Sequence, residues 1–165
     1  MTTREIEYGM VLVLRKMGTY MCFEVMMPDP HGRLGRSLER VDLLTFDTKG
    51  VWRFYEIKIT KSDFYSKAAH TFKGHLNYFV MPKALYEQVK DDIPPDIGVY
   101  VARSEKRSRP YEHEIVVCSC IKKARRRELG VDEDKLKFAF MQALSREHEK
   151  YRHLLGYQRK AVNNG

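Results

Sequence analysis

Two acidic residues and a lysine stand inside apolar runs where a chain would otherwise bury only hydrophobic side chains. Asp42 interrupts RVDLLTF, and Glu56 interrupts VWRFYEIKI, with Lys58 two residues after Glu56. Two carboxylates brought together near a sheet face repel each other and resist desolvation. A divalent cation relieves both effects, and Mg²⁺ typically takes one or two carboxylates while keeping several waters. A lysine beside such an ion can orient or help deprotonate an attacking water, and can stabilise charge growing on phosphorus.

The segments that carry these residues, 40–46 and 51–59, have the composition of strands and are joined by the turn DTKG. So short a turn predicts an antiparallel hairpin. Side chains alternate between the faces of a strand, so Glu56 and Lys58 project from one side, and Asp42 approaches them from the partner strand. The hairpin therefore predicts a small metal site. The plain alternative is an edge hairpin with solvated charges, in which Lys58 only neutralises Glu56.

The rest of the chain alternates between helical and strand patterns. One antiparallel hairpin followed by strands that are reached through helical crossovers predicts an α/β sandwich around a mixed sheet. The segment 103–110 is expected to be a polar loop. Periodicity, caps and turn residues predict a helix over 3–17, a strand at 20–27, the hairpin, a helix capped by Ser62 or Asp63 and running to about residue 74, a strand at 76–81, a short helix over 83–90 opened by Pro82, strands at 97–102 and 113–120, and a helix from about Asp132.

The first and last helices are each expected to present an apolar stripe to the sheet. In the first helix the stripe consists of Ile6, Met10, Val13, Leu14 and Met17. In the last helix the residues expected to be buried are Leu136, Phe140, Ala143, Leu144 and Tyr151. Both sets recur at the three- and four-residue spacing of an amphipathic helix.

Length and composition fit one domain with a full-sized core. The chain has 165 residues, of which 43% are hydrophobic and 32% charged. We expect a single domain over 1–165, with its core at about 3–120 and a basic helical tail at about 121–160. The N-terminus lacks the profile of a signal peptide, and no apolar run reaches the length of a membrane span. Three cysteines leave one unpaired in any disulfide scheme, which favours a reducing, cytoplasmic setting.

The net charge of +8 is concentrated in the C-terminal part. Residues 1–100 carry 14 Lys and Arg against 13 Asp and Glu, whereas residues 101–165 carry 16 against 9. Such a skew suggests a surface for a polyanion, most commonly nucleic acid. The run KKARRR is the densest candidate for phosphate contacts, although a solvated charge run is the alternative. The candidate nucleic-acid-binding residues are Lys73, Lys122, Lys123, Arg125, Arg126 and Arg127.

The residues VD at 41–42, the hairpin and EIK at 56–58 resemble the PD-(D/E)XK phosphodiesterase superfamily of nucleases. The continuation through ITKSDF, a helix, and the strands LNYFVMP and IGVYVA resembles its small MmcB-like members in bacteria and phages. The resemblance covers roughly residues 3–102 and implies an αβββαβ restriction-endonuclease-like core, a divalent metal and phosphodiester hydrolysis. Val41 stands where the name-giving motif has proline.

The resemblance also implies roles for particular residues. Asp42 and Glu56 would be metal ligands, the backbone carbonyl of Ile57 a further ligand, and Lys58 the catalytic lysine.

Many members of the superfamily also carry a glutamate on the first helix, and here Glu5 and Glu7 compete for that place. At about 100° per residue, Glu7 lies nearer the edge of the apolar stripe, so it is better placed to face the sheet. For either residue the alternative is a solvated side chain that complements the helix dipole.

We therefore expect a Mg²⁺- or Mn²⁺-dependent deoxyribonuclease that acts in DNA repair, recombination or phage DNA metabolism, in the cytoplasm of a bacterium or a phage-infected cell. The expected partner is nucleic acid, DNA before RNA, with a homodimer as a further possibility and no membrane. The alternative is a non-catalytic module that binds nucleic acid or protein on a nuclease-like fold. The residues leave open the strandedness of the substrate and whether cleavage is internal or terminal.

Overall fold

The sheet at the centre of the molecule has six strands that follow one another in chain order, β1-β2-β3-β4-β5-β6. In this computed structural model the described residues are 1–28, 39–66, 72–107 and 113–163. The elements are α1 (Thr3–Leu14), β1 (Thr19–Met26), β2 (Arg40–Asp47), β3 (Trp52–Ile57), α2 (Lys61–Phe64), β4 (Leu76–Pro82), α3 (Lys83–Val89), the 3₁₀ helix η1 (Lys90–Asp92), β5 (Gly98–Arg107), β6 (His113–Lys122) and α4 (Glu133–Asn163).

The direction of each strand follows from its connection. The tight turn after β2 makes β2 and β3 antiparallel, as predicted, with Leu43 opposite Tyr55 and Leu44 opposite Phe54. The helical crossovers make β3, β4 and β5 parallel to one another, and β1 and β6 are antiparallel to their neighbours. The predicted single α/β domain with a mixed sheet, an N-terminal helix and a C-terminal helix is confirmed.

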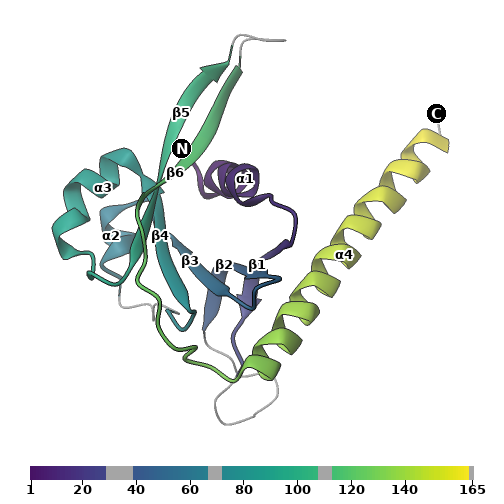
Figure 1. Ribbon diagram of the computed structural model, residues 1–165. Coiled ribbons are helices and arrows are strands. Elements are labelled where there is room, and N and C mark those ends of the chain that lie inside the picture. The colour runs from purple at the N-terminus through teal and green to yellow at the C-terminus, as the bar shows by residue number, and fades with distance from the viewer. Residues whose placement is uncertain (29–38, 67–71, 108–112, 164–165) are drawn as a thin grey trace.

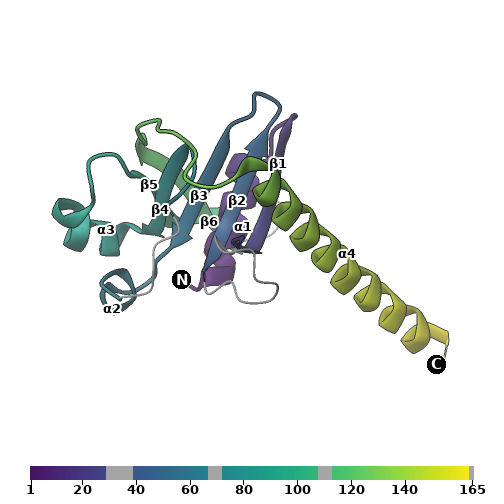
Figure 2. The same cartoon turned by 90° about the horizontal axis from the view of Figure 1, so that it is seen from below.

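Helices cover both faces of this sheet (Figure 1). Helix α1 packs Ile6, Met10 and Leu14 against one face, where the cluster includes Tyr55 and Ile57 of β3. The opposite face is covered by α2 and α3 over one half and by the beginning of α4 over the other, as the second view shows (Figure 2). The alternation along β3 therefore runs as expected, with residues 55 and 57 on the α1 side and residues 52 and 54 on the α4 side.

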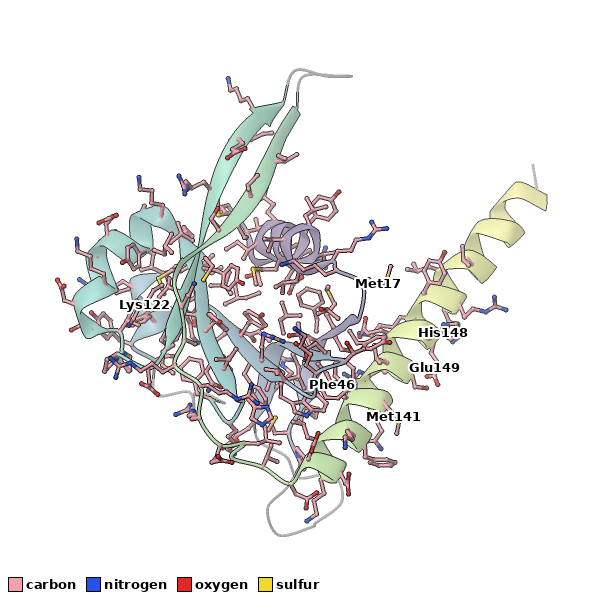
Figure 3. All side chains as sticks on the ribbon, viewed as in Figure 1. Met17, Phe46, Lys122, Met141, His148 and Glu149 are labelled. Carbon is pink, nitrogen blue, oxygen red and sulfur yellow. The ribbon has the colours of Figure 1, made fainter. Side chains whose placement is uncertain are left out.

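Helix α1 ends earlier than its apolar stripe predicts. It stops at Leu14, and Gly18 adopts the left-handed backbone conformation (φ 75°) that turns the chain into β1. Met17 therefore lies in the connecting loop (Figure 3) and is fully exposed instead of buried.

The helix predicted to run to about residue 74 is largely wrong in its bounds. Helix α2 has four residues, and its N-cap is Thr60, whose hydroxyl accepts the amide of Asp63 at 3.1 Å. Residues 72–75 are not helical, because Gly74 forms a turn in which its amide and carbonyl both bond to the Asn77 side chain at 2.9 Å. The middle of that predicted helix, residues 67–71, lies outside the described residues.

The polar segment predicted as a loop at 103–110 is a strand over its first five residues. Residues 103–107 continue β5 and pair with residues 113–117 of β6. Together they form a two-stranded arm that extends past α1 (Figure 1). The side chains of residues 103–106 are all exposed, so no alternation of buried and exposed positions marked this part of the strand in the sequence, whereas Val116 on the partner strand is buried against α1.

Helix α4 begins within one residue of its predicted start, but only part of its predicted stripe is buried. Leu136, Phe140 and Ala143 pack on the sheet, whereas Leu144 and Tyr151 are 39% and 59% exposed. The cause is length: the helix has 31 residues and runs past the edge of the sheet (Figures 1 and 2). Among the described residues, no helix combines the length and apolar character needed to cross a bilayer.

Candidate active site

Asp42 is tied to the segment that carries Glu56 and Lys58. Its Oδ2 accepts the backbone amide of Ile57 at 2.8 Å, across the boundary between β2 and β3. Ile57 lies between Glu56 and Lys58, so one hydrogen bond fixes the β2 carboxylate beside the Glu-Ile-Lys segment. The predicted approach of Asp42 to its partner strand is thus present in the structure.

An irregularity in the sheet turns Asp42 toward that amide. Val41 packs in the cluster on the α4 side, and Leu43 packs in the cluster on the α1 side, so the alternation of faces breaks at the residue between them. The β1–β2 pairing skips the same point, since Phe23 pairs with Leu43 and Val25 with Val41. Glu24, the residue skipped on β1, has φ 53°, a left-handed conformation uncommon for a residue with a side chain.

Lys58 and Glu56 are both buried although both belong to charged residue types. Their exposed fractions are 6% for Lys58 and 5% for Glu56. The ammonium of Lys58 forms an ion pair with Asp63 of α2, with 3.5 Å between Nζ and Oδ1. Burial of this kind argues against the solvated edge hairpin, because charged side chains are rarely buried at a purely structural edge.

The first helix contributes Glu7, not Glu5, to the surroundings of Asp42. Glu5 is engaged in a capping box with Thr2 at the start of α1 and is exposed. Partial burial raises the pKa of Glu7, and the negative charges of Glu24 and Asp42 raise it further. The structure therefore places Glu7 within the electrostatic reach of Asp42, as its position at the edge of the apolar stripe suggested.

The donors at this site fit a hard divalent cation. Burial raises the pKa of the Asp42 carboxyl, and this outweighs the lowering by the Ile57 amide and by Lys58. A cation would offset that desolvation. Within the described ranges, no three His, Cys, Asp or Glu side chains gather in a way that could hold a metal. The ligands predicted from the sequence, Asp42, Glu56 and the carbonyl of Ile57, include two carboxylates, within the one or two that Mg²⁺ usually takes.

The basic segment, residues 122–127, does not meet the carboxylates. The amide of Arg127 donates to the carbonyl of His75, whose ring accepts the amide of Trp52 at 3.1 Å. Trp52 opens β3, whereas Lys58 follows its last residue, so the two sites are at opposite ends of this strand. At about 3.3 Å per residue, roughly 20 Å separate them along the strand. Arg127 therefore lies near the start of β3, away from Glu56 and Lys58.

Members of the basic segment differ in what they contact. Lys122 donates to the carbonyl of Pro94 at 2.8 Å, and Arg127 pairs with Asp96 at 3.2 Å, so both hold the fold together. The other three basic side chains are exposed and make no ion pair within the described part of the chain: Lys123, Arg125 and Arg126.

Lys73 is likewise engaged in a local contact. It lies in the turn before β4, not on a helix, and its ammonium is 2.5 Å from the carboxylate of Glu39. This ion pair links the chain just before β2 to the chain just before β4.

The chain matches no family model and no curated protein. Among solved structures it is similar to a protein of unknown function from Silicibacter pomeroyi, with a TM-score of 0.63 and 16% identity. The similarity covers 92% of this chain and 89% of that one. At this level of identity the similarity concerns the fold.

Two residues of the site were missed from the sequence. The sequence suggests Asp63 only as a helix cap, whereas in the structure its carboxylate is the ion-pair partner of Lys58. Glu24 carried no signal beyond a lone acid in a strand, and its backbone conformation is visible only in the structure. For Asp63, the only signal in the sequence was its position five residues after Lys58, just beyond the N-cap residue Thr60.

Proposed function

We propose that this protein is a Mg²⁺-dependent nuclease that hydrolyses phosphodiester bonds, with DNA as the expected substrate. The observation that carries the proposal is the hydrogen bond from the Ile57 amide to Asp42, which brings the β2 carboxylate beside the segment that bears Glu56 and Lys58. The burial of Lys58 beside this bond supports the same conclusion.

Hydrolysis requires that a water oxygen bonds to phosphorus while the bond to the leaving oxygen breaks, with negative charge growing on the phosphoryl oxygens. Asp42 and Glu56 supply oxygen donors at one end of β3, and a bound Mg²⁺ would supply positive charge to the phosphoryl group there. Lys58 adds a positively charged hydrogen-bond donor beside them and would orient the water or stabilise the growing charge. Its ion pair with Asp63 restrains the side chain before substrate arrives.

The test compares cleavage with binding in Lys58→Ala. Labelled single-stranded, double-stranded and branched DNA and RNA are incubated with Mg²⁺, Mn²⁺ or EDTA, and affinity is measured separately with Ca²⁺ in place of the active metal. Because removal of one transition-state charge contact commonly costs about 10²–10³ in rate, we expect a loss of that size with little change in affinity. Lys61→Ala is the matched control, since Lys61 is an exposed lysine three residues away.

Two results would contradict the proposal. Absence of any metal-dependent cleavage by the unmodified protein would favour a binding module on this fold. Cleavage that persists undiminished in Lys58→Ala would move the activity to other residues or to a contaminant.

A further inference from the structure

The second half of α4 carries an apolar stripe with nothing beneath it. The sheet covers Leu136, Phe140 and Ala143, Arg146 still bonds to β1, and farther along the helix runs free of the body (Figures 1 and 2). Met141 and Tyr151 are each 59% exposed in this stripe, and Leu144 is 39% exposed. Large apolar side chains repeated on one exposed helix are typical of a surface that binds a partner.

The spacing of the stripe is that of a two-helix coiled coil. Its members follow one another at intervals of three, four, three and four residues, the a and d positions of a heptad: Met141, Leu144, His148, Tyr151 and Leu155. At about 100° per residue, the centre of this stripe lies roughly 90° around the helix from the side that packs on the sheet. A second helix can therefore lie along it without meeting the body of its own chain.

The charges that flank the stripe suit a second copy of this chain in parallel orientation. With Met141 at position a, Glu147 occupies position g and Arg152 position e of the next heptad. In a parallel pair, position g of one helix faces the following e of the other, so two Glu147–Arg152 pairs form by symmetry. In an antiparallel pair like positions face each other, and Glu147 would meet Leu154 or its own symmetry mate.

These two residues are available for such pairs. Arg152 is exposed and has no ion-pair partner among the residues that the structure describes. Glu147 pairs with Lys150 of the same helix at 2.7 Å, an exposed contact that is weak enough to be shared. His148, at a central a position, adds a polar side chain of the kind that fixes register in parallel coiled coils.

We propose that α4 joins two copies of this chain in a parallel, two-fold symmetric dimer through Met141, Leu144, His148, Tyr151 and Leu155. The Arg146 guanidinium, between Leu144 and His148 in the sequence, donates to the carbonyl of Glu24 at 2.9 Å and fixes this part of α4 to β1. The dimer does not depend on the proposed nuclease activity.

The mass of the full-length protein tests the proposal. Sedimentation velocity and light scattering across a concentration series should show a species of twice the 19.5 kDa chain mass that dissociates on dilution. Tyr151→Glu should shift the equilibrium to monomer. Phe138→Ser is the matched control, because Phe138 is 58% exposed on the same helix but lies about 100° from the stripe. A single mass near that of one chain at every concentration would contradict the dimer and would indicate that the stripe binds a different protein.

Charge exchange tests the parallel orientation. Glu147→Arg and Arg152→Glu should each raise the dissociation constant by roughly 2- to 30-fold, since each disrupts two exposed ion pairs. The double variant should return it toward the original value. Additive weakening in the double variant would overturn the parallel pairing.

A disulfide gives a second test of orientation. In a Cys120→Ser background, which removes the exposed thiol, His148→Cys should form a disulfide-linked dimer on mild oxidation because a positions face each other in a parallel pair. Glu149→Cys, one residue along the helix (both residues are labelled in Figure 3), should remain unlinked. Equal linking of the two variants would contradict the assigned register.

Discussion

The ammonium of Lys58 lies 3.5 Å from the carboxylate of Asp63. Asp63 is on α2 and is a third acid beside Asp42 and Glu56 of the strands. The other carboxylate oxygen of Asp63 accepts a hydrogen bond from the amide of Ile59 at 3.4 Å. Asp63 therefore contacts both the Lys58 ammonium and the backbone next to Lys58. The lysine thereby has a carboxylate partner on α2.

Asp63→Asn is expected to lower kcat about tenfold with KM for DNA almost unchanged, because the lysine loses its restraint while the binding surface stays intact. Calorimetry should show the same Mg²⁺ affinity as in the unmodified protein. Asp63→Glu, which keeps the charge, should recover part of the rate. If kcat is unaltered in Asp63→Asn while Lys58→Ala is inactive, the ion pair has no role in positioning the lysine.

Asp42→Asn is expected to make the metal-free protein more stable at neutral pH. The pKa of Asp42 is raised by burial, so the folded chain binds this proton more tightly than the unfolded chain and loses stability as the pH rises through the raised value. Asp42→Asn has no carboxyl to deprotonate at this position, so it does not lose this stability as the pH rises. Urea unfolding in EDTA should show the difference at pH 7, and it should shrink below the ordinary value of 3.8.

Added Mg²⁺ should make the unmodified protein more stable than Asp42→Asn, the reverse of their order without metal. A ligand that binds only the folded state stabilises it in proportion to the logarithm of its concentration. The unmodified protein should therefore gain stability as Mg²⁺ is added, and Asp42→Asn should not. An equal gain in both proteins would place the metal elsewhere.

Replacement of Lys123, Arg125 and Arg126 by Ala tests the exposed part of the basic segment. Because each lost phosphate contact removes about 0.9 from the slope of log K against log salt, the slope should flatten by up to about three units, uniformly across sequences. Arg127→Ala is the contrasting variant, since Arg127 binds Asp96 and the Phe72 carbonyl and its loss should reduce stability. A triple variant with unchanged affinity and slope would identify the segment as a solvated surface.

Gly98→Ala is expected to destabilise the fold by about 1–3 kcal/mol, the usual cost of overpacking. A β-carbon there would lie 2.4 Å from the Tyr78 ring and 2.6 Å from the backbone nitrogen of Ala124, and the backbone cannot yield cheaply. Gly156→Ala is the matched control on α4, where a β-carbon meets no atom within 4 Å, and it should be neutral or stabilising by up to about 1 kcal/mol. Chemical denaturation measures both, and similar losses in the two variants would contradict the packing described around Gly98.

Much of the fold was predictable because its elements obey local rules. The antiparallel hairpin follows from a short turn, and the parallel strands follow from helical crossovers, so the sheet could be anticipated from the chain. The error in the last helix has a clear physical origin. Periodicity reports which residues can be buried, not what will be there to cover them, so Tyr151 looked buried and is 59% exposed.

The candidate site was predictable only where it coincides with strand geometry. Asp42, Glu56 and Lys58 stood out because charged side chains interrupt apolar runs. The choice of Glu7 over Glu5 required the structure to show that Thr2 engages Glu5. The position of Arg127 near the start of β3 could not be foreseen either, since it depends on the bonds that the segment after β6 makes to Asp96 and His75.

The contact between Trp52 and α4 affects when the β2–β3 hairpin can be fully packed as the chain is synthesised. The Trp52 ring packs edge-on against Phe140, with 5.7 Å between centroids, and its Nε1 donates to Glu133 at 3.2 Å. A nascent chain that has emerged only as far as β6 contains every strand, yet it leaves this indole and its neighbour Phe54 open to water. This aromatic face of β3 can therefore be covered only after the last helix has been synthesised.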